Sequence, residues 1–226
     1  MTTRIDMNCD MGESYGAWTM GNDAAVLQFV SSANIACGFH GGDPATMRKT
    51  VAAALARGVA LGALASLQDL AGFGRRIIQI SPDEAYDIVV YQIGALAGVA
   101  ASQGARLHHV KAHGALYNMA AKDEGLARGI CQAVKGVGAS LILYGLAGSK
   151  LIDAARAIDL AAANEVFVDR SYQDDGSLTP RSRAGAMIED LDQAVAQVVR
   201  MVREGKVRSV DGKDVAFDAA ATTATI

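Results

Sequence analysis

The stretch SANIACGFHGGDPATMRKTVAAALARGVALGALAS, residues 32–66, decides the fold class. Its first apolar run, Ser32–Gly38, leads into a glycine-rich loop, and an Asp-Pro pair then opens a helical pattern that runs to about Arg57. A second apolar run, Ala60–Ser66, follows directly. Apolar runs without polar alternation are typical of parallel strands that are buried on both faces. This stretch therefore predicts one strand–helix–strand unit.

The same alternation extends over the rest of the chain. Further strands are predicted at Ile5–Asp10, Leu107–Lys111, Leu141–Tyr144 and Glu165–Asp169, and further helices at about Ser81–Gln103, Tyr117–Lys135, Gly148–Ile158 and Glu189–Glu204. Such units, joined by right-handed crossovers, form either an open doubly wound sheet or a closed β/α barrel. No linker interrupts them, which predicts a single domain over residues 1–226. The residues after Asp218 are either a terminal strand or a frayed end.

The composition argues against several classes of protein. Hydrophobic residues make up 51% of the 226 residues and charged residues 20%, with a net charge of −3, so neither disorder nor a nucleic-acid partner is expected. The uncharged run Ile88–Ala105 reaches the lower edge of membrane-spanning length, but its glutamines and glycines favour a buried helix and no membrane partner. An odd number of cysteines without a C-x-x-C pair favours the reducing cytoplasm over a disulfide framework.

Polar residues gather directly after the predicted strands. The clusters occupy residues 8–13, 37–43, 68–76, 111–118 and 169–170. In barrels and doubly wound sheets alike, sites form at the carboxyl ends of the strands. The clusters therefore predict one polar catalytic rim, and the long irregular stretch Ser171–Ala186 is expected to be functional or interfacial.

The acidic and histidine residues of this rim are the candidates for acid–base or metal chemistry. Asp10 ends an apolar strand, where it can act as a general base, bind a metal or cap the following turn, and Glu13 would face the same way on a helical turn or lie on the surface. His40 and His113 lie in glycine-containing loops at strand ends. Asp10 with these two histidines would suit a divalent metal such as zinc. His108 and its neighbour alternate along a strand, so at most one of the two is expected to be functional.

The basic residues of the rim suggest anion binding. Lys111 can stabilise an oxyanion or pair with a carboxylate, or it can extend to solvent. The Arg75-Arg76 pair, behind a Gly-Phe-Gly turn, suggests a loop that clamps an anion, and Arg170 can do likewise or pair with Asp169. The chain shows no dinucleotide fingerprint, phosphate loop or nucleophile elbow.

These clusters resemble the motifs of the LamB/YcsF family. The matching stretches are residues 8–13 (NCDMGE), 32–40 (SANIACGFH), 72–76 (GFGRR), 113–118 (HGALYN) and 165–170 (EVFVDR), and the resemblance runs from about residue 4 to about residue 212. It implies an irregular seven-stranded β/α barrel similar to the glycoside hydrolase/deacetylase barrels. It also implies an ATP-dependent 5-oxoprolinase activity, in which the chain is the A component beside partner subunits B and C and opens the lactam 5-oxoproline to L-glutamate.

The resemblance and the strand-end positions together assign roles to individual residues. Catalysis is assigned to Asp10, Glu13, His40, Lys111 and His113; substrate binding to Asn8, Asn34, Arg75, Arg76, Tyr117, Asn118 and Arg170; and a divalent metal to Asp10, His40 and His113. ATP is expected to be used by the complex, and a homo-oligomer is left open.

The chain departs from the family pattern at several positions. Leu64 stands where the family has a rim histidine, Ala112 replaces a proline, and the family's closing His-Gly-Asp is absent. Leu64 is expected to add apolar surface to the pocket and to weaken metal binding. Two alternatives follow: a non-catalytic or impaired binding component of the same complex, or a metal-dependent deacetylase of the same barrel superfamily.

Overall fold

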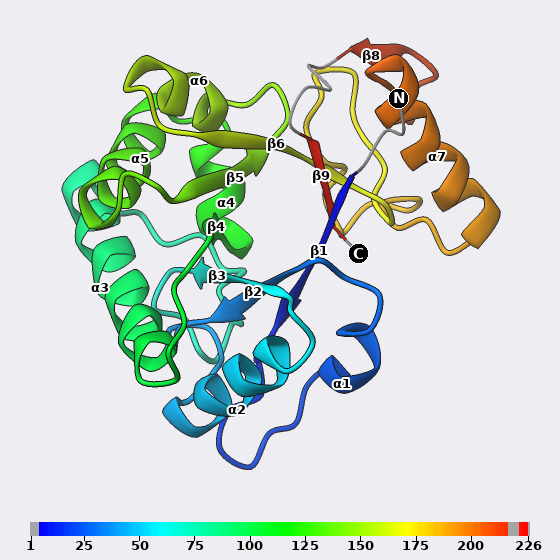
Figure 1. Cartoon of the computed structure of the whole chain (residues 1–226). Coiled ribbons are helices and arrows are strands. Elements are labelled where there is room, and N and C mark those ends of the chain that lie inside the picture. Colours follow the sequence, from blue (N-terminus) through cyan, green and yellow to red (C-terminus); the bar gives the residue numbers. More distant parts are fainter. Residues whose placement is uncertain (1–4, 217–221, 226) are drawn as a thin grey trace.

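The chain forms a closed barrel of parallel strands surrounded by helices, as a computed structural model shows for residues 5–216 and 222–225 (Figure 1). The barrel strands, in their order around the barrel, are β1 (Asp6–Met11), β2 (Ser32–Ala36), β3 (Ala60–Ala65), β4 (His109–Ala112), β5 (Ile142–Leu146), β6 (Ala162–Phe167) and β9 (Thr222–Thr225). The seven-stranded β/α barrel is therefore confirmed, and the open doubly wound sheet is not formed. Of the tail after Asp218, residues 222–225 are the closing strand, which pairs with β6 and β1, while the others lie outside the described residues.

The helices lie on the outside of the barrel, between successive strands (Figure 1). They are α1 (Asp23–Val26), α2 (Pro44–Leu55), α3 (Pro82–Ala101), α4 (Gly114–Ala120), α5 (Glu124–Val137), α6 (Lys150–Ala157) and α7 (Leu191–Glu204). The single helix predicted over residues 117–135 is two helices, because the Asp123 side chain accepts the Leu126 N–H and starts α5 anew. A short hairpin, β7 (Lys206–Arg208) with β8 (Asp214–Ala216), follows α7 and was not predicted.

Helices α2 and α3 begin at N-terminal capping residues that are visible in the sequence. The Asp43 carboxylate accepts the N–H groups of Ala45 and Thr46, and Pro44 occupies the first position of α2. Ser81 and Glu84 form a reciprocal capping box at the start of α3. Within the described residues, no helix is long and apolar enough to cross a membrane.

The two faces of the barrel strands differ in character. Outward side chains such as Ile35, Val110, Leu143 and Val166 join the hydrophobic core beneath the helices. Because successive side chains of a strand point to opposite faces, their neighbours point into the barrel. Those inward side chains are largely polar and buried: Asn8, Asn34, His109, Lys111, Glu165, Thr223 and Thr225. The barrel thus has an apolar exterior and a polar interior, and the polar interior continues into the candidate site.

Candidate functional site

Lys111 of β4 lies at the centre of the polar interior and is almost fully buried. Its Nζ is 3.0 Å from Asp10 Oδ1 and 2.7 Å from Glu165 Oε1, so one ammonium group pairs with two carboxylates. Thr225 Oγ1 of the closing strand accepts a third bond of 3.2 Å. Strands β1, β4, β6 and β9, which are distant in sequence, thereby meet at this one group.

The charges of this cluster stabilise one another. Burial alone would raise the pKa of Asp10, but Lys111 and His113 outweigh it and hold the pKa well below its usual range. Burial alone would lower the pKa of Lys111, but Asp10 and Glu165 outweigh it and raise the pKa. At neutral pH the lysine is an ammonium ion and Asp10 is a carboxylate.

A layer of hydrogen-bonded side chains supports Asp10 from below. Asn34 donates through Nδ2 to Asp10 Oδ1 (2.9 Å) and to Asn8 Oδ1 (2.7 Å). The Asn34 side-chain oxygen is 2.7 Å from His109 Nε2, which therefore carries the proton. Burial lowers the pKa of His109 to about 3, so its imidazole is neutral. These residues hold the carboxylate in place, and none of them lines the pocket described below.

His40 and His113 stack on each other above Asp10, with ring centroids 3.9 Å apart. Glu13 Oε1 lies 3.1 Å from His40 Nε2 and 3.6 Å from His113 Nδ1. His113 Nε2 is 3.1 Å from the carbonyl oxygen of Phe73, to which it can only donate. The lone pair of a neutral His113 is therefore on Nδ1, which faces the carboxylates of Glu13 and Asp10 (3.5 Å). Such an arrangement places an imidazole nitrogen and carboxylate oxygens where a metal cation can bind between them.

Glu13, His40 and His113 have the composition of a divalent metal site. Their ligand atoms lie within 4.8 Å of one another, and the Phe73 carbonyl orients His113 as outer partners orient metal-bound imidazoles. Burial lowers the pKa of His40, which keeps this ligand neutral. The sequence-based set contained Asp10 in the place of Glu13. In the structure Glu13 completes the group, while Asp10 directs Oδ1 to Lys111 and Asn34 and Oδ2 to His113.

Close backbone packing brings the loop after β3 against the histidines. Gly74 has φ +66°, and a Cβ there would lie 2.2 Å from Ser66 Oγ and 3.0 Å from His40 Cβ. A Cβ on Gly114, with φ +61°, would lie 2.4 Å from the carbonyl oxygen of Gly74. Glycine at both positions lets residues 72–76 reach His113, and it is the reason why these glycines lie in the motif.

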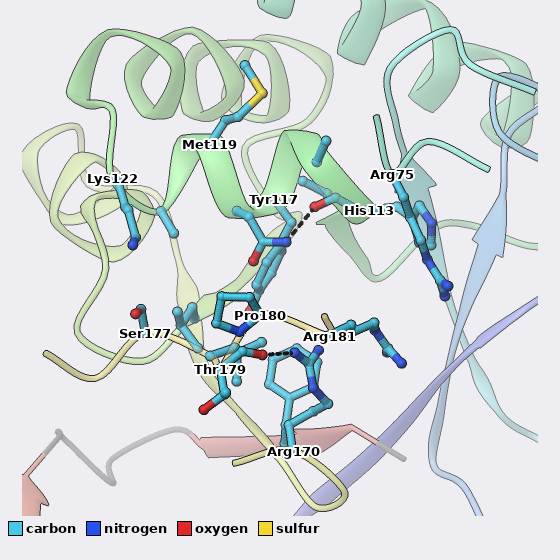
Figure 2. Close-up of a pocket in the computed structure, with 18 of the residues that line it drawn as sticks. Arg75, His113, Tyr117, Met119, Lys122, Arg170, Ser177, Thr179, Pro180 and Arg181 are labelled. Atoms are coloured by element: carbon cyan, nitrogen blue, oxygen red, sulfur yellow. Dashed lines mark hydrogen bonds between the residues drawn. The ribbon is translucent and has the colours of Figure 1, made fainter. Parts of the chain in front are cut away.

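A pocket of about 640 Å³ opens above this cluster (Figure 2). Asp10, Lys111 and His113 reach it from below, Tyr117 and Asn118 come from α4, and residues 177–181 form the facing wall. The predicted irregular stretch 171–186 thus supplies one side of the site. Arg170 holds it there by donating from Nη2 to the Thr179 carbonyl (2.6 Å).

The sequence-predicted binding residues separate into three groups. Arg75, Tyr117, Asn118 and Arg170 line the pocket. Asn8 and Asn34 lie inside the barrel beneath it. Arg76 does not line the pocket, because its guanidinium is bonded to the Asp69 carboxylate and the rest of its side chain points to solvent. Of the two adjacent histidines, His109 begins β4 and points inward, and His108, directly before the strand, is exposed.

The sequence of the whole barrel matches the LamB/YcsF family, over residues 5–224. The chain belongs to this family. Family relatives include the A subunit of 5-oxoprolinase from Bordetella pertussis, 77% identical over 219 residues (97% of this chain and 87% of that protein). Another is the A subunit of 5-oxoprolinase from Bacillus subtilis, 58% identical over 216 residues (96% and 84%). The crystal structure of a lactam utilization protein from Thermus thermophilus superposes with a TM-score of 0.93 at 46% identity, covering 99% of this chain and 90% of that one.

Leu64, where the family resemblance predicts a histidine, does not lie at the rim. It is fully buried inside the barrel, paired in register with Ala36 and Lys111, and it does not line the pocket. The expectation that it adds apolar surface to the pocket is therefore wrong. Ser66, two residues further along the strand, is the position whose side chain approaches Gly74 beside the stacked histidines.

Glu165, Thr225 and Arg181 contribute to the site and were not among the predicted site residues. Glu165 is a fully buried acid within a strand, and the alternation of that strand places it on the same face as Phe167, inside the barrel. A charged residue in an otherwise apolar run was the available signal. Nothing in the sequence around Arg181 marks it as a pocket residue, since its position depends on the path of an irregular loop.

Proposed function

We propose that the chain is the A component of an ATP-dependent 5-oxoprolinase, which opens the 5-oxoproline lactam to L-glutamate together with partner subunits B and C. The observation that carries the proposal is the buried Lys111, held between Asp10 and Glu165 and open to a pocket beside His113. The names of the relatives from Bordetella and Bacillus support the same activity. The three cysteines are free thiols, which fits the expected cytoplasmic location.

Lactam hydrolysis adds water to the ring carbonyl and breaks the ring C–N bond. In the proposed reaction, a carboxylate of Glu13 or Asp10 accepts the proton of the attacking water while Lys111 stabilises the oxyanion that forms on the carbonyl oxygen. The carboxylate passes this proton to His113 Nδ1, which faces it. When the tetrahedral intermediate collapses and the ring C–N bond breaks, His113 donates the proton to the departing ring nitrogen, which becomes the amine of glutamate. Arg75 binds the substrate carboxylate at the pocket wall.

Glu13, His40 and His113 are the residues that would hold a divalent metal, which supplies Lewis acidity and a more acidic bound water when present. The proton transfers above are assigned to this chain's own side chains. ATP is assigned to the complex as a whole. Transfer of its terminal phosphoryl group to the lactam oxygen, with release of ADP, would activate an otherwise stable amide; ring opening would then leave an acyl phosphate, and its hydrolysis would release phosphate and glutamate. The sequence holds no familiar phosphate loop.

Reconstitution of the chain with its partner subunits tests this function. The complex should convert 5-oxoproline to glutamate with ATP, and the isolated chain should show little activity. His113→Gln should lower turnover by about 10²–10⁴-fold because it removes the proton donor. His108→Gln, an identical change at an exposed histidine, is the matched control and should leave turnover unchanged.

Several results would contradict the proposal. Rapid opening of 5-oxoproline by the isolated chain without ATP would exclude the ATP-dependent scheme. Equal turnover of the wild-type and His113→Gln complexes would favour the non-catalytic binding component. Release of acetate from an N-acetylated sugar without ATP would favour the deacetylase, to which the Glu13, His40 and His113 cluster is also suited.

A further inference from the structure

The pocket is larger and more basic than a lactam requires. Pockets of about 300–1,000 Å³ accommodate drug-sized ligands, whereas 5-oxoproline is a single five-membered ring with one carboxylate. The pocket measures about 640 Å³, and Arg75, Arg170 and Arg181 all line it. Figure 2 shows these three labelled arginines on the same side of the pocket; Arg75 comes from the connection after β3, and Arg170 and Arg181 come from the connection after β6.

None of the three guanidinium groups forms a salt bridge with an acidic side chain among the described residues. Arginines elsewhere, such as Arg76 and Arg200, do form them. Arg75 lies over the Phe73 ring at 5.0 Å, and Arg170 donates to the carbonyl oxygens of residues 179 and 186. Arg181 contacts the sulfur of residue 187 at 3.3 Å. These neighbours orient the guanidinium groups. Among the described residues, Glu13 and Asp10 act on Arg75 and Asp169 acts on Arg170, but none of them lies within salt-bridge distance.

The three charges also act on one another. Burial and the proximity of Arg181 lower the pKa of both Arg75 and Arg170. By contrast, Asp69 raises the pKa of the neighbouring Arg76. The deeper cation of the pocket, the ammonium of residue 111, is already compensated by its two carboxylates. The positive charge without a salt-bridge partner therefore lies on the three arginines and not on Lys111, where the lactam carbonyl is proposed to react.

We infer that Arg170 and Arg181 form a subsite for a phosphoryl group, beside Arg75, which is assigned to the substrate carboxylate. This inference rests on the proposed function. The carboxylate of 5-oxoproline accounts for one positive charge, and a phosphoryl dianion accounts for the other two. Planar guanidinium groups bind phosphate oxygens in pairs, and a phosphoryl dianion between Arg170 and Arg181 removes their mutual repulsion. The unpartnered hydroxyl of Thr179, beside Arg170 in the same wall, offers a further donor.

The phosphoryl group has two sources in an ATP-dependent lactamase: the terminal phosphate of ATP, or a phosphate ester on the oxygen of the lactam. The recognition chemistry is the same in both cases, so the subsite is defined by the phosphoryl group. The source decides whether this chain meets the nucleotide itself or an activated lactam made by one of its partners.

Isothermal titration of the purified full chain with inorganic phosphate, 5-oxoproline and MgATP tests the subsite. The variant is Arg181→Gln, which removes one guanidinium without touching the Asp10, Lys111 and His113 cluster. The control is Arg106→Gln, an exposed arginine before β4 that does not line the pocket. We expect Arg181→Gln to weaken phosphate binding by about 10–100-fold. Arg106→Gln should leave phosphate binding unchanged.

Titrations with phosphate, 5-oxoproline and MgATP distinguish ATP from a phosphorylated lactam as the source of the phosphoryl group. They also distinguish failure of the subsite from failure of the proposed function. Phosphate that binds more tightly when 5-oxoproline is present supports a phosphorylated lactam, and MgATP that displaces phosphate and depends on Arg181 supports the nucleotide. Phosphate binding that depends on Arg181 without any 5-oxoproline binding would keep the subsite and overturn the lactam function. Equal phosphate affinity of the wild type and Arg181→Gln, or no phosphate binding by the wild type, would overturn the subsite.

Discussion

The inner and outer faces of β4 carry opposite kinds of side chain within four residues. His109 and Lys111 point into the barrel, whereas Val110 and Ala112 belong to the hydrophobic core beneath the helices. Burying an apolar side chain stabilises a fold by about 1.5–3 kcal/mol, whereas a buried charge is costly unless it is paired. The outer face of β4 therefore contributes to the stability of the barrel, and the inner face contributes charged and polar groups to the candidate site.

The difference between the two faces indicates which substitutions the fold tolerates. Each outer side chain stabilises the fold through its own buried apolar area, so truncating one of them costs only that contribution and the cavity it leaves. The inner residues depend on one another, because the removal of one charge leaves its partners unpaired. The following predictions test this contrast, from the largest expected effect to the smallest.

Lys111→Met should lower the free energy of unfolding by about 3–5 kcal/mol, because it leaves Asp10 and Glu165 without their cation. Val110→Ala, one residue away on the outer face, is the matched comparison and should cost about 1–3 kcal/mol. Urea denaturation at pH 7 measures both. A cost below about 1 kcal/mol for Lys111→Met would show that the inner charges are not coupled as described.

Stability should fall in mild acid because of His109. Its pKa is about 3 in the folded chain and 6.5 as a free side chain, so below pH 6.5 only the unfolded chain binds the proton. The free energy of unfolding should therefore drop by about 1.4 kcal/mol per pH unit between pH 6 and pH 5. His109→Gln keeps a donor to Asn34 and removes this slope. Parallel curves for the two proteins in urea titrations at several pH values would contradict the assignment.

Leu64→His should lower the free energy of unfolding by about 1–3 kcal/mol and leave the affinity for zinc or manganese unchanged, because position 64 is buried inside the barrel and does not line the pocket beside Glu13, His40 and His113. Urea denaturation measures the stability, and calorimetric titration of the metal into both proteins measures the affinity. Leu61→His, on the outer face of the same strand, is the matched control and should also leave metal binding unchanged. A gain of about 10–100-fold in metal affinity for Leu64→His alone would show that position 64 does reach the metal cluster.

Ser81→Ala should cost about 1 kcal/mol, because it removes the hydroxyl that accepts the Glu84 N–H at the start of α3. Ser102→Ala at the other end of the helix should cost less than about 0.5 kcal/mol, as for most surface changes. Urea denaturation of the two variants gives the comparison. A similar cost at both positions would show that the capping box adds nothing specific.

The sequence was sufficient for barrel strands β1 to β6 and for the rim, since unbroken apolar runs followed by Asp, His and Gly are local signals; it left β9 open and did not predict β7 and β8. Asp10, His40 and His113 come together because the carboxyl ends of parallel strands share one rim. The sequence did not show that one oxygen of Glu13 lies near both histidines whereas Asp10 lies near His113 and the buried lysine, because that depends on the three-dimensional path of the loop after β1. The sequence also placed Arg76 among the binding residues, whereas its guanidinium bonds the Asp69 carboxylate. That bond depends on the shape of the turn over residues 69–76, which no local sequence pattern specified.

The closing strand β9 has a consequence for the order of folding. Its Thr225 hydroxyl is 2.9 Å from Asn8 Oδ1, a contact between residues 217 positions apart, and it also meets Lys111. Contacts of such high sequence separation form late, because the closure of the connecting chain costs entropy before the contact stabilises anything. We expect the helices and strands of the middle of the chain to form first, and the polar interior to become dry only when β9 joins β1 to β6. The site would then be completed at the last step of folding, well after its individual residues are synthesised.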